Sequence, residues 1–175
     1  MDALYFLLDS ILGFAVFAFL LRVLLQIVRA DFRNPLAQAV VALTNWLVLP
    51  LRRVLPPIRR FDTASLVALL VVQFGATLIL FRVRTGVVFP FLPLAAAALR
   101  ALALAALLLY TILIFVYAAL SFIAPGARSP ATSLLAVLCE PVLRPLRRVL
   151  PIVGGIDFSP LVAIIGLTAL RILIR

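Results

Sequence analysis

The chain has 175 residues, of which 66% are hydrophobic, and it carries a formal net charge of +10 at pH 7. An ordinary soluble domain does not reach this apolar fraction, so the composition excludes that class and indicates a membrane protein. There is no histidine and only one cysteine, Cys139. An intrachain disulfide is therefore excluded, and the commonest catalytic base and metal ligand is missing.

Residues 3–28 form the first apolar run and predict a membrane-spanning helix. The run is too long for the apolar region of a signal peptide and has no basic segment before it, so we expect it to be retained. Arg22 and Gln26 lie one turn apart near its end and share a helix face. We expect Arg22 to snorkel towards the lipid head groups. The alternative is a polar face packed against a partner or the other half of the chain.

Asn34 and Pro35 are typical of a helix start, with asparagine as the N-cap and proline in the first turn. We expect a helix over residues 36–49 that ends at Pro50, because an internal proline removes a hydrogen bond and clashes with the preceding turn. This helix is too short to span a bilayer and is predicted to lie at the interface. Its polar stripe is interpreted as a wetted face, with a seam between the two halves as the alternative; it comprises Gln38, Asn45 and Arg52.

The segment Pro-Leu-Arg-Arg-Val-Leu-Pro follows, and it occurs twice, at residues 50–56 and 145–151. The agreement continues on both sides at a constant offset of 95 residues, which indicates an internal duplication. We predict two repeats, residues 1–88 and 89–175. Prolines at both ends of the segment predict a short Arg-Arg turn between helices. The repeated motif comprises Pro35, Pro50, Pro56 and Asp62 in the first copy and Pro130, Pro145, Pro151 and Asp157 in the second.

Adjacent arginines at a membrane boundary bind lipid phosphate and hold a loop on the cytoplasmic side. We predict that the arginines of the repeated segment are lipid-facing anchors; they are Arg52, Arg53, Arg147 and Arg148. Asp62 and Asp157 follow the two segments and suit the positive end of a helix dipole, so each is interpreted as an N-cap. A further role that could coexist is an ion pair with an arginine of the preceding segment.

Residues 64–81, 94–123 and 158–174 are expected to form the second, third and fourth spans. Gln73 and Thr168 occupy equivalent positions in the second and fourth of these spans. Polar groups at one depth in both copies predict a hydrogen bond between the two helices.

The order span, interfacial helix, Arg-Arg turn and span therefore occurs twice. It predicts an all-α membrane protein with four transmembrane helices from two parallel two-helix repeats, each with a short interfacial helix and an Arg-Arg turn. The repeats would be related by an axis along the membrane normal, unlike the inverted repeats of many transporters. The positive-inside rule puts the repeated arginine-rich loops in the cytoplasm and both termini outside the bacterial inner membrane.

Asp9 would be the one carboxylate inside a span, so we expect it to be protonated, wetted or paired. Arg100 and Arg171 would lie at the same end of the molecule. Arg100 is the favoured partner, because the first and third spans are equivalent in the repeat. The alternative is that Asp9 begins a solute path. The intramembrane polar residues of interest are Asp9, Arg22, Gln26, Gln73, Arg100 and Thr168.

Together these motifs resemble the YggT family, also called YlmG. The resemblance rests on the Asn/Ser-Pro start, the Pro-x-Arg-Arg-x-x-Pro segment and the Asp-x-x-Ser/Pro-Leu-Val-Ala segment, and it covers nearly the whole chain. Members are small bacterial and plastid membrane proteins, often with two such repeats. The resemblance implies links to cell division or envelope organisation, to osmotic and potassium homeostasis and, in plastids, to nucleoid distribution and cytochrome maturation. It implies no agreed biochemical activity.

The sequence lacks a histidine to activate a serine, a glycine-rich phosphate loop and a zinc-binding motif, so we expect no enzyme, no cofactor and no metal. We expect an assembly or organising factor of the cell envelope, acting in cell division, membrane-protein assembly or osmotic stress tolerance. The alternative is an ion channel or transport component in osmotic and potassium homeostasis. The expected partners are the lipid bilayer and its anionic head groups and not nucleic acid, with other membrane or division proteins and a second copy left open.

Overall fold

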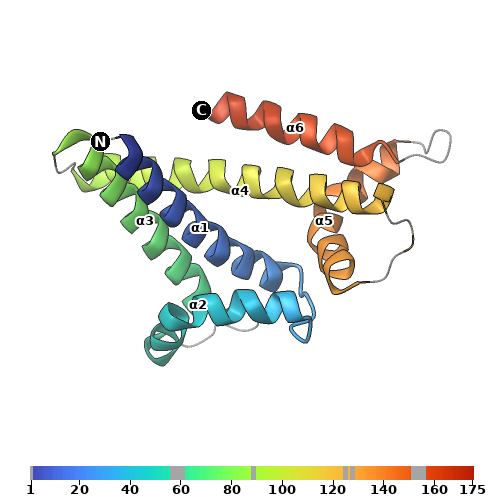
Figure 1. Ribbon diagram of the computed structural model, residues 1–175, viewed down its shortest axis with the longest axis horizontal. Coiled ribbons are helices and arrows are strands. Elements are labelled where there is room, and N and C mark those ends of the chain that lie inside the picture. Colours follow the sequence, from blue (N-terminus) through green and yellow to red (C-terminus); the bar gives the residue numbers. More distant parts are fainter. Residues whose placement is uncertain (1, 56–61, 88–89, 124–125, 127–128, 151–156) are drawn as a thin grey trace.

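The computed structural model describes residues 2–55, 62–87, 90–123, 126, 129–150 and 157–175 (Figure 1). Within these residues the chain is helical, as predicted, with six helices. They are α1 (Asp2–Ile27), α2 (Pro35–Val54), α3 (Thr63–Thr85), α4 (Phe91–Ile123), α5 (Pro130–Val149) and α6 (Ser159–Ile174). Pro56 and Pro151 of the repeated motif lie outside the described residues.

Among the described helices, α1, α3 and α4 are long and apolar enough to cross a membrane. α6 is also apolar but has 16 residues, fewer than the roughly 20 that span a bilayer core. The helices therefore indicate a membrane protein with three spans by length and composition, and a fourth span at α6 stays a prediction.

The six helices form two groups of three. α1 packs against α3, and α4 packs against α6, while α2 and α5 each contact both helices of their own group. α3 also packs against α4 and joins the groups. In Figure 1 the two termini and the α3–α4 connection lie towards one end of the molecule, whereas α2 and α5 lie at the far ends of the two long pairs.

Packing is densest at the end that holds α2 and α5. The main cluster of buried side chains there includes Phe19 and Leu25 of α1, Leu69 of α3, Ile114 of α4 and Leu138 of α5. The first half of α1 is exposed on most positions, including Phe14 at 65%. The molecule is therefore tightly packed around the second half of α1 and more open around its first half.

The two short helices begin and end at equivalent positions, because α2 spans Pro35–Val54 and α5 spans Pro130–Val149, an offset of 95 residues. Both continue through internal prolines, Pro50 in α2 and Pro141 and Pro145 in α5. The predictions that the helix ends at Pro50 and that the arginines form a separate turn were therefore wrong. Both arginine pairs lie in the last helical turn of α2 and α5.

A proline removes one backbone hydrogen bond and presses on the turn before it, but it does not disturb the residues after it. Pro50 stands one turn from the end of α2, so few helical bonds depend on it. The backbone amide of Leu55 still donates to the Leu51 carbonyl at 2.8 Å and closes the last turn. Arginines in that turn also stabilise the negative end of the helix dipole.

The start of each short helix follows the sequence prediction. The side chain of Asn34 accepts a hydrogen bond from the Leu36 amide at 2.9 Å, and Ser129 accepts one from the Thr132 amide at 3.1 Å. Asn34 has a second contact, because its Nδ2 donates to the Pro130 carbonyl at 2.7 Å. A single side chain thus caps α2 and ties it to the start of α5.

Candidate functional site

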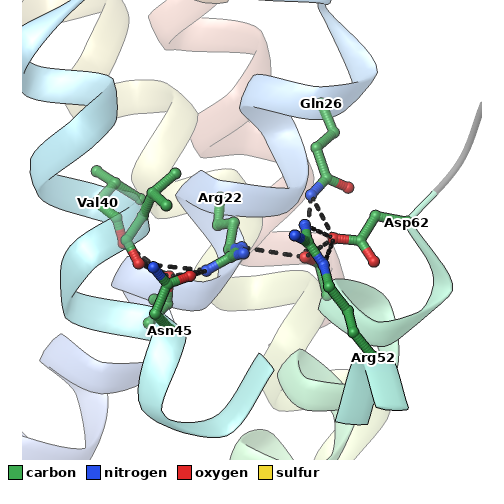
Figure 2. A network of polar contacts seen from close by, with 9 residues as sticks. Arg22, Gln26, Val40, Asn45, Arg52 and Asp62 are labelled. Atoms are coloured by element: carbon green, nitrogen blue, oxygen red, sulfur yellow. Dashed lines mark hydrogen bonds and ion pairs between the residues drawn. The ribbon is translucent and has the colours of Figure 1, made fainter. Parts of the chain in front are cut away.

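The most concentrated polar contacts surround Arg22, near the C-terminal end of α1. Arg22 is only 2% exposed. Its Nε donates to Ser65 Oγ at 3.0 Å, and its Nη1 donates to Thr44 Oγ1 at 2.7 Å and to Asn45 Oδ1 at 2.9 Å (Figure 2). The same Nη1 donates to the Val41 carbonyl at 3.3 Å. One guanidinium therefore connects α1 with both α2 and α3.

The expectation that Arg22 snorkels was wrong. A buried cation is tolerated only where polar groups replace its hydration, and here the neighbouring helices supply them. The alternative of a packed polar face is closer, although the face packs against α2 and α3 of its own half of the chain. Asn45 belongs to this packed face and not to a wetted stripe, whereas Gln38 is exposed.

The Thr44 hydroxyl is oriented to accept from Arg22 by a hydrogen bond within α2. Its hydroxyl donates to the Val40 carbonyl at 2.7 Å, one turn earlier, and is 0% exposed. With the proton directed back along α2, the oxygen can accept from Arg22. No carboxylate in the described ranges forms an ion pair with Arg22, so neutral oxygens hold this charge.

Asp62 joins this arrangement through Ser65. Asp62 Oδ2 accepts from Arg52 Nε at 3.0 Å, from the Arg52 Nη2 group, from Ser65 Oγ at 2.8 Å and from Gln26 Nε2 at 3.3 Å. Gln26 Nε2 also donates to Ser65 Oγ at 2.9 Å. We call this set the Arg22 network; it comprises Arg22, Gln26, Thr44, Asn45, Arg52, Asp62 and Ser65.

Asp62 occupies the N-cap position of α3, but its side chain makes no capping hydrogen bond. It pairs instead with Arg52, the second role that the sequence allowed. Burial raises the pKa of the Asp62 carboxyl, but hydrogen bonds from Arg52 and Ser65 and the charges of Arg52 and Arg22 outweigh burial. The net pKa lies below the ordinary value, so the carboxylate is ionised at neutral pH.

The second half repeats the outer part of this network. Arg147 Nε donates to Asp157 Oδ2 at 2.8 Å, and Asp157 Oδ1 accepts from the Ser159 amide at 2.9 Å. Burial raises the pKa of Asp157. Hydrogen bonds from Ser159 and Arg147 lower it by more than burial raises it, so the net pKa lies below the ordinary value. The Asp157 side chain is 33% exposed against 14% for Asp62.

The inner part of the network is absent from the second half. At the offset of 95 residues, Tyr117 stands for Arg22, Cys139 for Thr44 and Pro160 for Ser65. The Tyr117 hydroxyl accepts from Arg147 Nη2 at 3.5 Å, and the guanidinium lies 5.9 Å from the ring centroid. Arg147 therefore contacts an aromatic ring, whereas its counterpart Arg52 lies beside the network of the buried Arg22.

Arg53 and Arg148 differ from their neighbours. Both are exposed in the last turns of α2 and α5, and neither forms an ion pair within the described ranges. The four predicted anchors thus separate into two arginines paired within the fold, Arg52 and Arg147, and two that face outwards.

Two predicted pairings of intramembrane residues were wrong. Gln73 is 6% exposed and donates to Thr77 Oγ1 at 3.1 Å within α3, while Thr168 is exposed on α6. A hydroxyl one turn along the same helix satisfies the glutamine without a neighbour. Arg100 Nε donates to the Ile174 carbonyl at 2.8 Å, at the negative end of α6, and not to Asp9.

Asp9 lines a cavity that Arg84 and Arg171 also line. Cys139 is 0% exposed, and burial raises the pKa of its thiol to about 12. The thiol is therefore a poor probe of membrane topology. Of the side chains that the structure describes, no three His, Cys, Asp or Glu are grouped so that they could hold a metal ion.

Sequence reasoning missed Thr44 and Ser65 as partners of Arg22. A signal was available in the comparison of the two copies. Arg22, Thr44 and Ser65 differ together from the equivalent residues of the second copy, Tyr117, Cys139 and Pro160, so the cation and both hydroxyl acceptors are replaced at once. Coordinated loss at a fixed offset is expected of residues in one contact cluster.

Comparison with known proteins agrees with these motifs. The CCB3/YggT family model matches residues 1–83 and 96–175. The chain is 38% identical to the uncharacterized protein YggT of Escherichia coli K12 over 166 residues, which cover 94% of this chain and 85% of that protein. It is 36% identical over 156 residues to the uncharacterized protein PA0392 of Pseudomonas aeruginosa, covering 89% and 79% of the two chains.

A third relative is an uncharacterized protein in the proC 3' region of Vibrio alginolyticus, 34% identical over 172 residues that cover 95% of this chain and 90% of that protein. No solved structure matches the chain. Because the family model spans both halves and the relatives align over almost the full length, the chain belongs to the CCB3/YggT family.

Proposed function

We propose that the chain is a non-catalytic integral membrane protein that organises or assembles other membrane proteins in the bacterial cell envelope. The observation that carries the proposal is the Arg22 network, whose polar groups are engaged with one another and hold three helices together. The polar side chains that could act in catalysis are thus used to stabilise the packing of α1, α2 and α3. The outer helix faces remain apolar, with Phe14, Phe115 and Leu173 at 65%, 63% and 83% exposure, and suit contact with lipid or membrane partners.

The membrane arrangement belongs to the same proposal. Repeats 1–88 and 89–175 each contribute two crossings, with the termini outside the inner membrane and the ends of α2 and α5 in the cytoplasm. Equal bounds of α2 and α5 support it. The 16 residues of α6 can cross where the bilayer thins and where Arg171 snorkels.

In a Cys139→Ala background, an impermeant thiol reagent should label Thr85→Cys from outside intact cells and Arg53→Cys only in inverted vesicles. The opposite pattern would reverse the topology.

Arg53 and Arg148 are proposed as the anchors that bind anionic lipid head groups. Each exposed cation near an anionic surface contributes about 1 kcal/mol of attraction. The double variant Arg53→Gln/Arg148→Gln should therefore lose affinity for vesicles containing phosphatidylglycerol while losing little thermal stability, because only its interaction with the helix dipole is removed. The matched double variant Arg52→Gln/Arg147→Gln should lose stability first, because both arginines pair with aspartates. Equal lipid binding by the outward-facing double variant and the unmodified chain would refute the anchor role.

The organising role is tested by crosslinking in intact cells followed by affinity isolation from native membranes. We expect a small, reproducible set of division or envelope proteins at constant ratio to the chain, absent when an unrelated membrane protein of equal abundance is isolated. Deletion of the gene should then mislocalise those partners and reduce growth in high-osmolarity medium. Isolation of the chain without any enriched partner would count against an organising role.

A transport component is the second candidate, because Asp9, Gln73 and Thr77 line one cavity between α1, α3 and α4. Purified chain in liposomes would be tested for potassium flux, with Asp9→Asn and Gln73→Leu as variants. Flux above that of empty liposomes that either variant changes at least several-fold would replace the organising role by transport. Flux at the level of empty liposomes would remove this candidate.

A further inference from the structure

The cavity beside the first half of α1 has a volume of about 590 Å3. It lies between α1, α3 and α4, and Arg171 of α6 also lines it. Small side chains create the space: Ala97, Ala101 and Ala105 follow one another at four-residue spacing along α4, and Gly13 faces them from α1. The volume falls within the roughly 300–1,000 Å3 of small-molecule sites.

Three charged side chains line the cavity, Asp9, Arg84 and Arg171. All three are exposed, and no ion pair joins them or engages them elsewhere in the described part of the chain. Arg84 is the next-to-last residue of α3, and Arg171 lies in the last turn of α6. Asp9 lies about two turns into α1. The three charges therefore lie within about two turns of a helix end, while the apolar part of the lining continues further along the helices.

This pattern matches one class of molecule. An apolar wall accommodates an acyl chain, two guanidiniums bind a phosphate, and a carboxylate accepts hydrogen bonds from an ammonium group. We propose that the cavity binds a phospholipid with a phosphoethanolamine head group, its phosphate between Arg84 and Arg171 and its ammonium at Asp9. The inference rests on the membrane placement of the proposed function and is independent of the organising role.

Other head groups fit less well. A phosphoglycerol head group satisfies the arginines but leaves the Asp9 carboxylate without a cation. A phosphocholine head group carries a quaternary ammonium, which has no N–H to donate to that carboxylate. The expected order of occupancy is therefore phosphatidylethanolamine above phosphatidylglycerol and phosphatidylcholine.

The test is native mass spectrometry of the chain released from nanodiscs that contain equal amounts of the three lipids. The unmodified chain should retain one phosphatidylethanolamine molecule preferentially. Loss of one arginine contact lowers affinity about fivefold, so Arg84→Gln/Arg171→Gln should lower it roughly 25-fold. Asp9→Asn should remove the preference for phosphatidylethanolamine while retaining phosphate binding. Arg82→Gln/Arg175→Gln is the matched control, because these arginines lie at the same end without lining the cavity.

A second variant separates lipid loss from misfolding. A Cβ added at Gly13 meets no heavy atom within 4 Å, and because Gly13 lines the cavity, a leucine there is expected to occupy part of its volume. Gly13→Leu should keep or raise the melting temperature, because leucine favours a helix over glycine, yet lower lipid retention at least about fivefold. Gly75→Leu is the control, since Gly75 is equally unobstructed and does not line the cavity.

Equal retention of the three lipids by the unmodified chain, or unchanged retention in both Gly13→Leu and the Arg84/Arg171 variant, would mean bulk lipid only and overturn the inference. A chain that does not insert into nanodiscs would instead refute the membrane placement of the proposed function. A chain that inserts without retaining phosphatidylethanolamine refutes only the lipid site.

Discussion

The two halves of the molecule hold the same surface pair but different interiors behind it. In each half an arginine in the last turn of α2 or α5 pairs with an aspartate just before the helix that follows, Arg52 with Asp62 and Arg147 with Asp157. Behind the first pair lies the buried Arg22. Behind the second, Tyr117 stands at the equivalent position and contacts Arg147 through its hydroxyl and ring.

The difference shows how demanding a buried cation is. Arg22 requires an acceptor at every neighbouring position, which Thr44, Asn45 and Ser65 supply. Once tyrosine replaces the arginine, those acceptors have no donor, and cysteine and proline can take their places. The surface pair is common to both halves, whereas the positions of Arg22, Thr44 and Ser65 differ between them; the position of Asn45 keeps a polar residue, Glu140.

Removing the buried cation should have the largest effect. Arg22→Leu leaves the acceptors on α2 and α3 unsatisfied and should lower the free energy of unfolding by about 3 kcal/mol. The matched change Tyr117→Leu should cost about 1 kcal/mol, because it removes weaker contacts. Thermal unfolding in detergent measures both. The double variant Arg22→Tyr/Thr44→Cys, which copies the second half, should recover part of the loss. Equal costs at positions 22 and 117 would contradict the comparison.

The surface pairs should differ by less. Asp62→Asn removes a carboxylate that accepts from Arg52, Ser65 and Gln26, and it should cost about 2 kcal/mol. Asp157 is more exposed and has fewer partners, so Asp157→Asn should cost about 1 kcal/mol or less. Chemical unfolding of the two variants in the same detergent gives the comparison. A larger cost at Asp157 would mean that the Arg22 network adds nothing to the surface pair.

Acid should weaken the Asp62–Arg52 and Asp157–Arg147 pairs, because the pKa of each aspartate is lower in the folded state than in the unfolded state. The folded-state pKa of Asp62 is lowered by its partners, so the stabilisation is complete above the unfolded value of about 3.9. It is lost as pH falls below that value through the folded pKa. The melting temperature of the unmodified chain should therefore decline below about pH 4, and that of Asp62→Asn should decline less. Parallel declines in the two proteins would exclude Asp62 as the titrating group.

The element types and their order follow from apolar length and helix-start residues, because those signals are local. The predicted end at Pro50 failed because a proline loses only its own hydrogen bond and presses on the turn before it, so the residues after it can continue the helix, as they also do after Pro141 in α5. The burial of Arg22 was hidden for a different reason. Its partners lie 22 and 43 residues away on other helices, and no local pattern fixes which side of α1 faces them. For Gln73 the prediction failed in the opposite way. A partner on another helix was expected, whereas the actual partner, Thr77, is one turn away on the same helix.

The smallest effect concerns the pair Thr44 and Cys139, equivalent positions that are both 0% exposed. With the pKa of Cys139 raised to about 12, roughly one thiol in ten thousand is ionised at pH 8, so thiolate chemistry should be very slow. Maleimide should label the folded protein only slowly and the unfolded protein at once. A cysteine at position 44, made by Thr44→Cys in a Cys139→Ala background, should react somewhat faster, because it neighbours the Arg22 cation. Rapid labelling of folded Cys139 would show that the second interior opens readily.

The burial of Arg22 also sets an order of events during synthesis. The residue that accepts from its Nε, Ser65, lies 43 residues further along the chain. At ribosomal speeds of about 5–20 residues per second, α1 emerges several seconds before that acceptor exists. The acceptors on α2 are made about halfway through this interval, but the Nε of Arg22 still lacks its acceptor on α3 and needs water or lipid head groups until Ser65 is made. The polar contacts of α1 are therefore completed only when α3 has been made.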